Sequence, residues 1–349
     1  MAAFYGTKLR LSVFGESRAQ SIGMSLEGVP AGETIDLTAL QAFLDRRAPG
    51  NAPWTTARKE PDRPRFLSGL SEGVTTGEPI TAVIDNLDIS EESAPTVLRP
   101  GHADWPAYVR YGEIPTGGGK FSGRLTAPVC IAGGICLQLL KKHGIAIGAH
   151  AKMIANIDDL PFDTMAPQLA LLQDKPFPVL DDAAGARMQT SIMAAKAAGD
   201  SVGGIIECAV TGLPAALGDH LWEGMESRIA QLVFGIPGVK GVAFGNGFDA
   251  ANLRGSGNND ALCLKDGEIC AESNRHGGIL GGMTTGLPLI FTAAVKPTPS
   301  IGIAQRSVNV AKKEETVLEN RGRNDPCIVP RAVPVTEAMA ALAIFDAVK

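Results

Sequence analysis

Near its start the chain reads Ser21-Ile-Gly23-Met-Ser-Leu-Glu27-Gly28-Val-Pro30-Ala31, and a helix-like segment follows. The second half carries a related stretch, in which residues 201–210 lead to Gly212-Leu-Pro214-Ala215 and again to a helix-like segment. Glycine and proline close together mark turns, so both stretches predict a strand, a Gly-x-Pro-Ala turn and then a helix. The chain therefore has a faint internal repeat.

Two further pairs of motifs repeat in the same order. They are Gly73-Val-Thr75-Thr76-Gly77 with Gly282-Met-Thr284-Thr285-Gly286, and Gly101-His102-Ala-Asp104 with Gly322-Arg323-Asn-Asp325. Three pairs of similar motifs in the same order predict two related halves, about 10–145 and 195–349, around a pseudo-twofold axis. We expect these halves to form a single domain over residues 1–349.

Helix and strand signals alternate irregularly along the chain. Caps and stop signals predict four helices: one after Asp36 that ends at Pro49-Gly50, one from Thr126 to Gly144, one after Asp219 and one from Pro334. Residues 204–210 and 289–295 are rich in β-branched side chains and predict strands. This pattern favours an α+β fold with helices packed on antiparallel sheets. The sequence lacks a Walker motif and a G-x-G-x-x-G in a Rossmann context, which argues against both nucleotide-binding folds.

The composition is unusual in its turn-forming residues. The 349 residues include 41 glycines and 23 prolines but only 5% aromatic residues. Such a chain needs many turns with positive φ or close approaches between backbone segments. Gly133 and Gly134, inside an expected helix, each cost about 1 kcal/mol relative to alanine, which close packing against another element could offset.

The net charge of −5 argues against a globally basic nucleic-acid binder. Positive charge is nevertheless concentrated in one short stretch, which contains Arg46, Arg47, Arg58, Lys59, Arg63 and Arg65. This stretch forms either a solvated face or a pocket for an anionic small molecule.

The six cysteines show no C-x-x-C pair, and the five histidines do not combine with them at a zinc spacing. We expect no metal site, and we expect reduced, mostly buried thiols in a cytosolic protein. No stretch reaches about 18 consecutive apolar residues, and residues 1–15 lack a hydrophobic signal core. The sequence therefore predicts a cytoplasmic location.

Two motifs in the first half could carry chemistry. The run Gly117 to Arg124 precedes an expected helix and suits an anion, although it could also be a flexible turn. In Arg99-Pro-Gly-His102-Ala-Asp104, a histidine in a Pro-Gly turn is followed by a carboxylate. His102 is either a proton donor or a structural side chain.

The second half has comparable candidates. Residues 274–282 and 296–300 offer glycine-rich backbone with Lys296 and Thr298, which could hold a phosphorylated cofactor or form ordinary surface loops. In Arg321-Gly-Arg323-Asn-Asp325, two arginines accompany one aspartate. Asp325 is either part of a surface ion pair or a carboxylate held ionised to act as a base.

Together these motifs resemble the chorismate synthase family along nearly the whole chain. The matching stretches include Gly15-Glu16-Ser17, Arg46-Arg47-Ala-Pro49-Gly50, Arg99 to Asp104, Gly117 to Arg124, Arg254-Gly255-Ser256 to Asn259-Asp260, Gly277 to Gly282, Lys296 to Ile301 and Asp325-Pro326-Cys327. The resemblance implies helices sandwiched between β-sheets, internal pseudo-symmetry and a homotetramer. It also implies a lyase that converts 5-enolpyruvylshikimate 3-phosphate to chorismate and phosphate in the last step of the shikimate pathway. This 1,4-elimination needs reduced FMN without net redox change.

The resemblance also implies residue roles. Asp325 would be the base acting with the flavin N5, His102 would protonate or orient the reduced flavin, and Arg18 stands at a catalytic position. Substrate would be bound by Ser17, Arg47, Ser122, Arg124 and Arg323. FMN would be bound by Ser256, Asn259, Gly277, Gly278, Lys296, Pro297, Thr298, Pro299 and Ser300. The family is associated with NADP, but the chain shows no separate reductase domain, so an external flavin reductant is expected.

Three positions depart from the family pattern. Arg18 replaces the family's second catalytic histidine, Asn324 replaces a common histidine, and Pro53 replaces a basic residue. Arginine cannot release a proton near neutral pH, but it could stabilise a leaving phosphate by bidentate hydrogen bonds. These departures leave an alternative open, a divergent homologue that binds flavin or an anion without this elimination, or that uses an altered substrate. A more distant alternative is a flavodoxin-like electron carrier.

Overall fold

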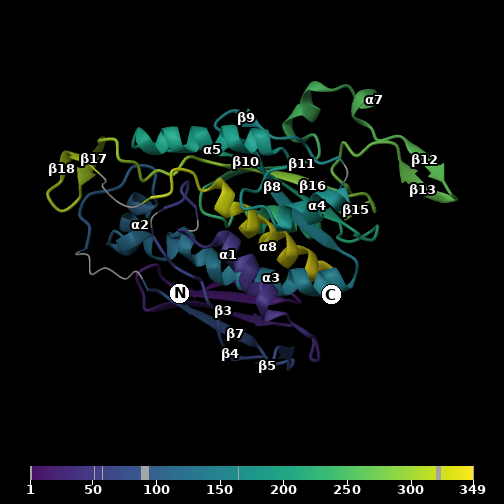
Figure 1. Ribbon diagram of the computed structural model, residues 1–349, viewed down its shortest axis with the longest axis horizontal. Coiled ribbons are helices and arrows are strands. Elements are labelled where there is room, and N and C mark those ends of the chain that lie inside the picture. Colours follow the sequence, from purple (N-terminus) through teal and green to yellow (C-terminus); the bar gives the residue numbers. More distant parts are fainter. Residues whose placement is uncertain are drawn as a thin grey trace.

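The computed structural model describes residues 2–50, 52–56, 58–87, 94–163, 165–319 and 324–348. Within these ranges, two antiparallel five-stranded sheets enclose a layer of helices (Figure 1). The first sheet has the order β1 (Ala3–Tyr5), β2 (Arg10–Gly15), β3 (Ser21–Glu27), β7 (Ile80–Asp85) and β4 (Arg65–Ser68). The second has the order β11 (Val239–Phe244), β16 (Leu289–Val295), β10 (Gly204–Thr211), β8 (Ala146–Ile154) and β9 (Ile157–Asp158). The predicted α+β fold and both predicted strands are confirmed.

The middle layer consists of α1 (Leu37–Arg47), α3 (Thr126–Lys142), α6 (Met225–Val233) and α8 (Val329–Val348), with α1 packed on α3 and α6 packed on α8. Most side chains of α3 and α8 are buried, so these two helices form the centre of the core. A Cβ added to Gly133 would lie only 2.3 Å from the Cβ of Ala338 in α8, and one added to Gly134 would lie 2.5 Å from Leu40 of α1. Both glycines therefore allow close helix packing, as the sequence predicts.

The core helix α3 also bears on membrane association. By length and composition, the segment Thr116–Lys142 is apolar enough to cross a membrane. However, 78% of its most apolar stretch is buried inside the fold. The expectation that no stretch is apolar enough is therefore too strict, because a helix packed between two sheets is apolar on all sides.

The remaining elements lie around this sandwich. The helices are α2 (Asp104–Tyr111), α4 (Met165–Gln173), α5 (Asp182–Ala197) and α7 (Gly255–Asn258). Four short 3₁₀ turns are Thr116–Phe121, Gly123–Leu125, Leu221–Glu223 and Gly247–Asn252. Four hairpins pair β5 (Leu70–Ser71) with β6 (Val74–Thr75), β12 (Leu262–Lys265) with β13 (Glu268–Ala271), β14 (Ile279–Leu280) with β15 (Met283–Thr284), and β17 (Gln305–Asn309) with β18 (Glu314–Leu318).

Two of the four predicted helix starts are confirmed. Asp36 caps α1 by accepting hydrogen bonds from the backbone N–H groups of Thr38 and Ala39 at 2.8 and 2.9 Å. The helix α3 begins at Thr126, and Lys141 and Lys142 lie in its last turn. Both helices start from local cap or turn signals, which sequence alone carries.

The other two predicted starts are wrong. Asp219 accepts from the N–H and the ring of His220, and α6 begins only at Met225, whose N–H donates to Gly282 O. The last helix begins at Val329, so Pro334 lies inside it rather than at its start. A proline costs least near a helix N-terminus, and here it removes one backbone donor from the second turn of α8.

The two halves share a hydrogen-bond pattern at the repeated turns. In each half a threonine hydroxyl donates to a proline carbonyl at 2.6 Å and accepts, at 2.9 Å, from the N–H three residues after that proline. The two sets are Thr75 with Pro30 and Glu33, and Thr284 with Pro214 and Leu217. The two-halves organisation stays a prediction, which these matching bonds support.

A buried histidine joins the second sheet to the segment that follows it. His150 of β8 is fully buried, with Nδ1 2.7 Å from Oδ2 of Asp159 and Nε2 3.0 Å from Oε2 of Glu207 in β10. Burial alone would lower the pKa of His150, but hydrogen bonds to the two carboxylates outweigh it and raise the pKa. The carboxyl pKa values of Asp159 and Glu207 are lowered in turn, so the three groups form a charged cluster.

Candidate active site

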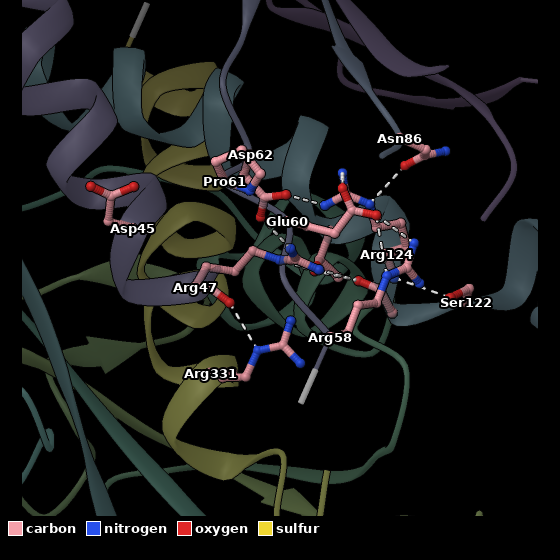
Figure 2. A network of polar contacts seen from close by, with 12 residues as sticks. Asp45, Arg47, Arg58, Glu60, Pro61, Asp62, Asn86, Ser122, Arg124 and Arg331 are labelled. Atoms are coloured by element: carbon pink, nitrogen blue, oxygen red, sulfur yellow. Dashed lines mark hydrogen bonds and ion pairs between the residues drawn. The ribbon is translucent and has the colours of Figure 1, made fainter. Parts of the chain in front are cut away.

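Two arginines from different parts of the chain converge on one buried carboxylate (Figure 2). Arg47, in the last turn of α1, places Nη1 2.5 Å from Oδ2 of Asp62. Arg124, just before α3, donates from Nη1 to Oδ1 of Asp62. The three side chains are at most 4% exposed. Burial raises the pKa of Asp62, but the two arginines outweigh it and hold this pKa below its usual range.

Arg47 is fully engaged within the chain. Besides Asp62, it donates from Nε to Thr126 Oγ1 at 3.1 Å and from Nη2 to Gly123 O at 3.0 Å. Each of its three nitrogens therefore has an intramolecular partner. These bonds fix the guanidinium between α1 and the start of α3.

One guanidinium nitrogen of Arg124, Nη2, is buried but donates no hydrogen bond to the described residues. Its Nε donates to Asn86 Oδ1 at 2.9 Å, and its backbone N–H donates to Ser122 Oγ at 3.2 Å (Figure 2). Its Nη2 lies 3.7 Å from Glu60 Oε2 and has no hydrogen-bond partner among the described residues. Buried polar groups in folded proteins are rarely left unpaired, so this nitrogen points to an anionic ligand. Ser122, a predicted substrate residue, acts here as the cap of the turn Gly123–Leu125.

Two acidic residues at the site were not identified from the sequence. Glu60 accepts from Arg58 Nη2 at 2.7 Å and from Leu87 N at 3.1 Å, and it is fully buried like Asp62. Both lie inside the basic stretch of residues 46–65. Acidic residues interleaved with arginines were the available signal, because a buried cluster of like charges needs counter-charges.

Asp325, the predicted base, is linked to the same cluster. Its Oδ1 accepts from the backbone N–H of Thr56 at 2.9 Å, and its Oδ2 lies 2.5 Å from Nη1 of Arg331. Arg331 also donates from Nε to Arg47 O at 2.9 Å (Figure 2). Sequence reasoning missed Arg331, which lies in the first turn of α8, six residues beyond Asp325. The predicted neighbours Arg321 and Arg323 lie outside the described residues.

The structure brings the Ser17-Arg18 motif against the predicted anion-binding glycines. Ser17 Oγ donates to Gly117 O at 2.8 Å, and its N–H donates to Gly119 O at 3.3 Å. A Cβ at Gly117 would lie 2.8 Å from Arg18 Nε, and the φ of Gly117 is +60°. Glycine is therefore required here by conformation and by the close approach of Arg18.

His102 lies against the predicted cofactor segment 296–300. Its Nε2 lies 2.6 Å from Ser300 Oγ, and its Nδ1 lies 3.0 Å from Pro100 O. A carbonyl only accepts, so Nδ1 carries a hydrogen and neutral Nε2 accepts from the Ser300 hydroxyl. Burial, followed by the charge of Arg99, lowers the pKa of His102.

The same segment holds a second unpaired polar atom. Lys296 Nζ donates to Gly101 O at 2.6 Å, which fastens the segment to the His102 turn. The backbone carbonyl of Thr298 accepts from Ser201 Oγ at 2.6 Å. The hydroxyl of Thr298 is buried without a hydrogen-bond partner among the described residues. This hydroxyl and Lys296 suit a phosphorylated or polar cofactor.

The other predicted cofactor residues lie together elsewhere. Ser256 is in α7, and Asn259 O accepts from Arg275 Nη1 at 2.8 Å. Asp260 accepts from the N–H of Arg275 at 2.9 Å, which joins this region to the turn at Gly277 and Gly278. Gly277 O accepts from Ile290 N at 3.0 Å, at the beginning of β16.

The structure therefore does not gather all predicted cofactor residues in one place within a single chain. The Gly277-Gly278 turn adjoins the start of β16 (Leu289–Val295), whereas Lys296 to Ser300 follow its end. At about 3.3 Å per residue, the strand separates the two groups by about 20 Å. Sequence order cannot show this separation, because it depends on which end of the strand each loop contacts.

Pro53 and Asn324 are each close in the sequence to a residue of the site. Pro53 O accepts from Lys196 Nζ at 2.7 Å, and Asn324 directly precedes Asp325. Pro53 and Arg331 line a cavity of about 370 Å³ between α1 and the start of α8. None of the predicted catalytic, substrate or cofactor residues lines this cavity. In the part of the chain that the structure describes, no group of His, Cys, Asp and Glu side chains is arranged to hold a metal ion.

Comparison with known proteins agrees on one family. The family model described as chorismate synthase matches residues 9–348. The chorismate synthase of Lancefieldella parvula is 45% identical and covers 99% of this chain and 96% of its own. That of Thermococcus kodakarensis is 44% identical, with 98% and 96% covered, and that of Methanocella arvoryzae is 42% identical, with 98% and 93% covered.

A solved structure supports the same assignment. A crystal structure of chorismate synthase superposes with a TM-score of 0.77 at 27% identity, and the match covers 98% of this chain and 92% of the other. The match extends over both sheets and the helices between them. The chain therefore belongs to the chorismate synthase family.

Proposed function

We propose that this chain converts 5-enolpyruvylshikimate 3-phosphate to chorismate and phosphate, with reduced FMN as cofactor. The observation that carries the proposal is the 42–45% identity to three relatives named chorismate synthase over at least 98% of the chain. The alternative of a divergent, non-catalytic homologue is not favoured, because the relatives share both the name and nearly full length with this chain. The experiment that tests the proposal is anaerobic turnover of this substrate with reduced FMN.

The segment 296–300 fits the proposed cofactor. Thr298 contributes a buried hydroxyl that lacks a partner, and Lys296 contributes a positive charge beside the backbone of Gly101. When bound, reduced FMN supplies the electron density that helps expel the phosphate from C3 of the substrate. His102 borders this segment through Ser300, so it is placed to orient the cofactor and to hold a proton at its ring nitrogens.

The basic cluster is the proposed substrate-binding region. The substrate carries a phosphate and two carboxylates, so it needs several fixed cations. Arg124 offers the buried Nη2, and Arg18 lies against Gly117 at the edge of the same region. The proposed substrate-binding residues also include Ser17, Arg47, Ser122 and Arg323. Arg18 would stabilise the leaving phosphate by charge rather than by proton transfer.

Asp325 is the proposed acceptor of the hydrogen lost from C6. The Thr56 N–H and Arg331 hold its carboxylate in one orientation, and Arg331 ties it to Arg47. Preorganised geometry of this kind lets a carboxylate act without further rearrangement. Arg331 is therefore a positioning residue in this account.

We also propose a cytoplasmic homotetramer supplied with reduced flavin by an external reductant, with the reduced form of NADP, NADPH, as the ultimate source of electrons. The separation of about 20 Å between the two cofactor groups supports an assembly. In a homo-oligomer, the Ser256–Asn259 region of one copy could complete the Lys296–Ser300 region of another.

A further inference from the structure

The hairpin formed by β12 (Leu262–Lys265) and β13 (Glu268–Ala271) projects from the body of the fold, at the right of Figure 1. Its two-residue turn, Asp266-Gly267, has positive φ at both positions, 55° and 85°. An Asp-Gly turn of this type fixes the pairing of its two strands. In the resulting register Cys263 lies directly opposite Cys270, and the two sulfur atoms are 3.0 Å apart.

This geometry is close to that of a disulfide. Counted from the turn, the Cys263–Cys270 pair is a hydrogen-bonded pair, for which Cα atoms lie about 5.5 Å apart. Disulfides span Cα distances of about 4.4–6.8 Å with an S–S bond of about 2.05 Å. The sulfurs must therefore approach by about a further 1 Å, which a small twist of the hairpin supplies while the strands keep their register.

The same pairing makes the bond easy to reduce. Opposed side chains in an antiparallel pair have Cβ atoms about 4.5–5.5 Å apart, whereas a relaxed disulfide needs about 3.8 Å. The hairpin must twist to close this gap, which strains the bond. Strained, exposed disulfides have more oxidising potentials than structural disulfides and exchange readily with thiols.

The environment of the pair also sets it apart from the other cysteines. Cys263 and Cys270 are partly exposed, whereas the remaining four are buried: Cys130, Cys136, Cys208 and Cys327. Burial raises the pKa of the Cys130 and Cys327 thiols to about 12. The hydrogen bond with Cys270 raises the pKa of Cys263 as well, so exposure rather than thiol acidity distinguishes the pair. A dissolved disulfide can reach Cys263 and Cys270 but not the buried thiols.

We propose that Cys263 and Cys270 form a reversible redox site that exchanges with low-molecular-weight disulfides. One cysteine thiolate attacks the reagent disulfide, breaks its S–S bond and releases one thiol. The second cysteine then attacks the mixed disulfide, closes the Cys263–Cys270 bond and releases the second thiol. The protein loses two electrons and two protons, and the reagent disulfide becomes two thiols.

The site lies between two segments proposed to bind flavin, and this part of the inference rests on the proposed function. The backbone N–H of Glu272 donates to Ala261 O at 2.9 Å, one residue beyond the open end of the hairpin. Asp260 then accepts from Ser273 Oγ at 2.5 Å and from the N–H of Arg275 at 2.9 Å. A twist of the hairpin is therefore transmitted to the segments that carry Asn259 and Gly277.

The experiment exposes the full-length protein to mixtures of oxidised and reduced glutathione, blocks free thiols and digests with trypsin. Trypsin cuts after Arg254, Lys265 and Arg275, so the two cysteines fall on separate peptides, 255–265 and 266–275. The expected result is a disulfide-linked pair of these peptides that disappears as reduced glutathione increases, with the four buried cysteines fully alkylated after unfolding. C263S and C270S serve as matched controls and should give only a glutathione adduct on the remaining cysteine. Stable glutathione adducts without the linked pair in the unmutated protein would overturn the proposal.

A second readout separates the disulfide from its coupling to the flavin segments. The dissociation constant of FMN should differ at least twofold between the oxidised and reduced forms, and this difference should vanish in C263S. Equal constants would overturn the coupling while leaving the disulfide intact. Absence of FMN binding in both forms would instead contradict the proposed function.

Discussion

The hydroxyl of Ser300 lies 2.6 Å from Nε2 of His102, although 198 residues separate the two in the chain. A second bond, from Lys296 Nζ to Gly101 O at 2.6 Å, holds the same two segments together. The turn that carries His102 and the segment proposed to bind flavin therefore form one unit. In this unit the histidine ring has a defined tautomer and a defined orientation.

The first prediction concerns His102. The change His102→Ala should lower kcat by about 10²–10³-fold, which is typical for loss of a positioned proton carrier. FMN affinity should change much less, because Lys296 and Thr298 remain. Ser300→Ala should give a smaller loss of kcat, since the ring keeps its bond to Pro100 O. Anaerobic steady-state kinetics and an FMN titration measure both, and a His102→Ala kcat within twofold of the unmutated value would contradict this role.

The second prediction concerns Asp325 and Arg331. Asp325→Ala should abolish detectable turnover while FMN still binds, because it removes the proposed proton acceptor. Arg331→Lys should retain part of the activity, and Arg331→Gln should retain less, since only lysine keeps a positive charge beside Asp325. The positioning role further predicts that both Arg331 variants shift the pH profile of kcat. Turnover of Asp325→Ala near the unmutated rate, or an unchanged pH profile in Arg331→Gln, would argue against these assignments.

The third prediction concerns Arg18, which lies beside Gly117 at the edge of the proposed substrate region. If Arg18 acts by charge, Arg18→Ala should raise KM for the substrate about tenfold or more, and Arg18→Lys should recover part of that loss. Steady-state kinetics of the three proteins provide the measurement. Equal KM values would show that Arg18 does not contact the substrate.

The fourth prediction concerns the buried cluster around His150. The pKa of His150 is higher in the folded protein than in the unfolded chain, where it is about 6.5. The contribution of His150 to stability is therefore complete below pH 6.5 and is lost as the pH rises through the higher pKa of the folded state. The carboxylates of Asp159 and Glu207 face the ring, and Lys152 Nζ lies 3.5 Å from the backbone carbonyl of Asp159. The melting temperature should therefore fall between pH 6 and 9. In His150→Gln this fall should be weaker, because glutamine cannot titrate. Parallel pH curves for the two proteins would exclude His150 as the cause.

Cap residues and strand-forming residues correctly predicted those helix starts and strands that depend mainly on neighbouring residues in the sequence. The cap at Asp36 and the strands at 204–210 and 289–295 depend on neighbouring residues, and the structure confirms them. The predicted helix start at Asp219 is wrong because a tertiary contact intervenes: Met225 N, at the start of α6, bonds Gly282 O. The predicted start at Pro334 is wrong because α8 already begins at Val329. Propensity is a weak determinant where such contacts compete.

The site could be predicted only in part for a similar reason. The structure brings His102 against the 296–300 segment and Ser17 against the Gly117 run, two contacts that the sequence analysis did not state. The counter-charges at Glu60 and Asp62 and the partner at Arg331 were missed, although each lies within or near a motif that the sequence singled out. The sequence does not show which charged side chains become buried together. The split of the cofactor residues between two ends of β16 likewise depends on how the chain folds back on itself.

The most direct test of the account is anaerobic mixing of the purified protein with 5-enolpyruvylshikimate 3-phosphate and reduced FMN. We predict release of one phosphate for each chorismate formed, an absorbance increase from the new diene, and no net oxidation of the flavin over many turnovers. The Asp325→Ala protein, prepared in parallel, should bind FMN and release no phosphate. Bound reduced flavin and bound substrate without phosphate release from the unmutated protein would contradict the central claim that this chain catalyses the elimination.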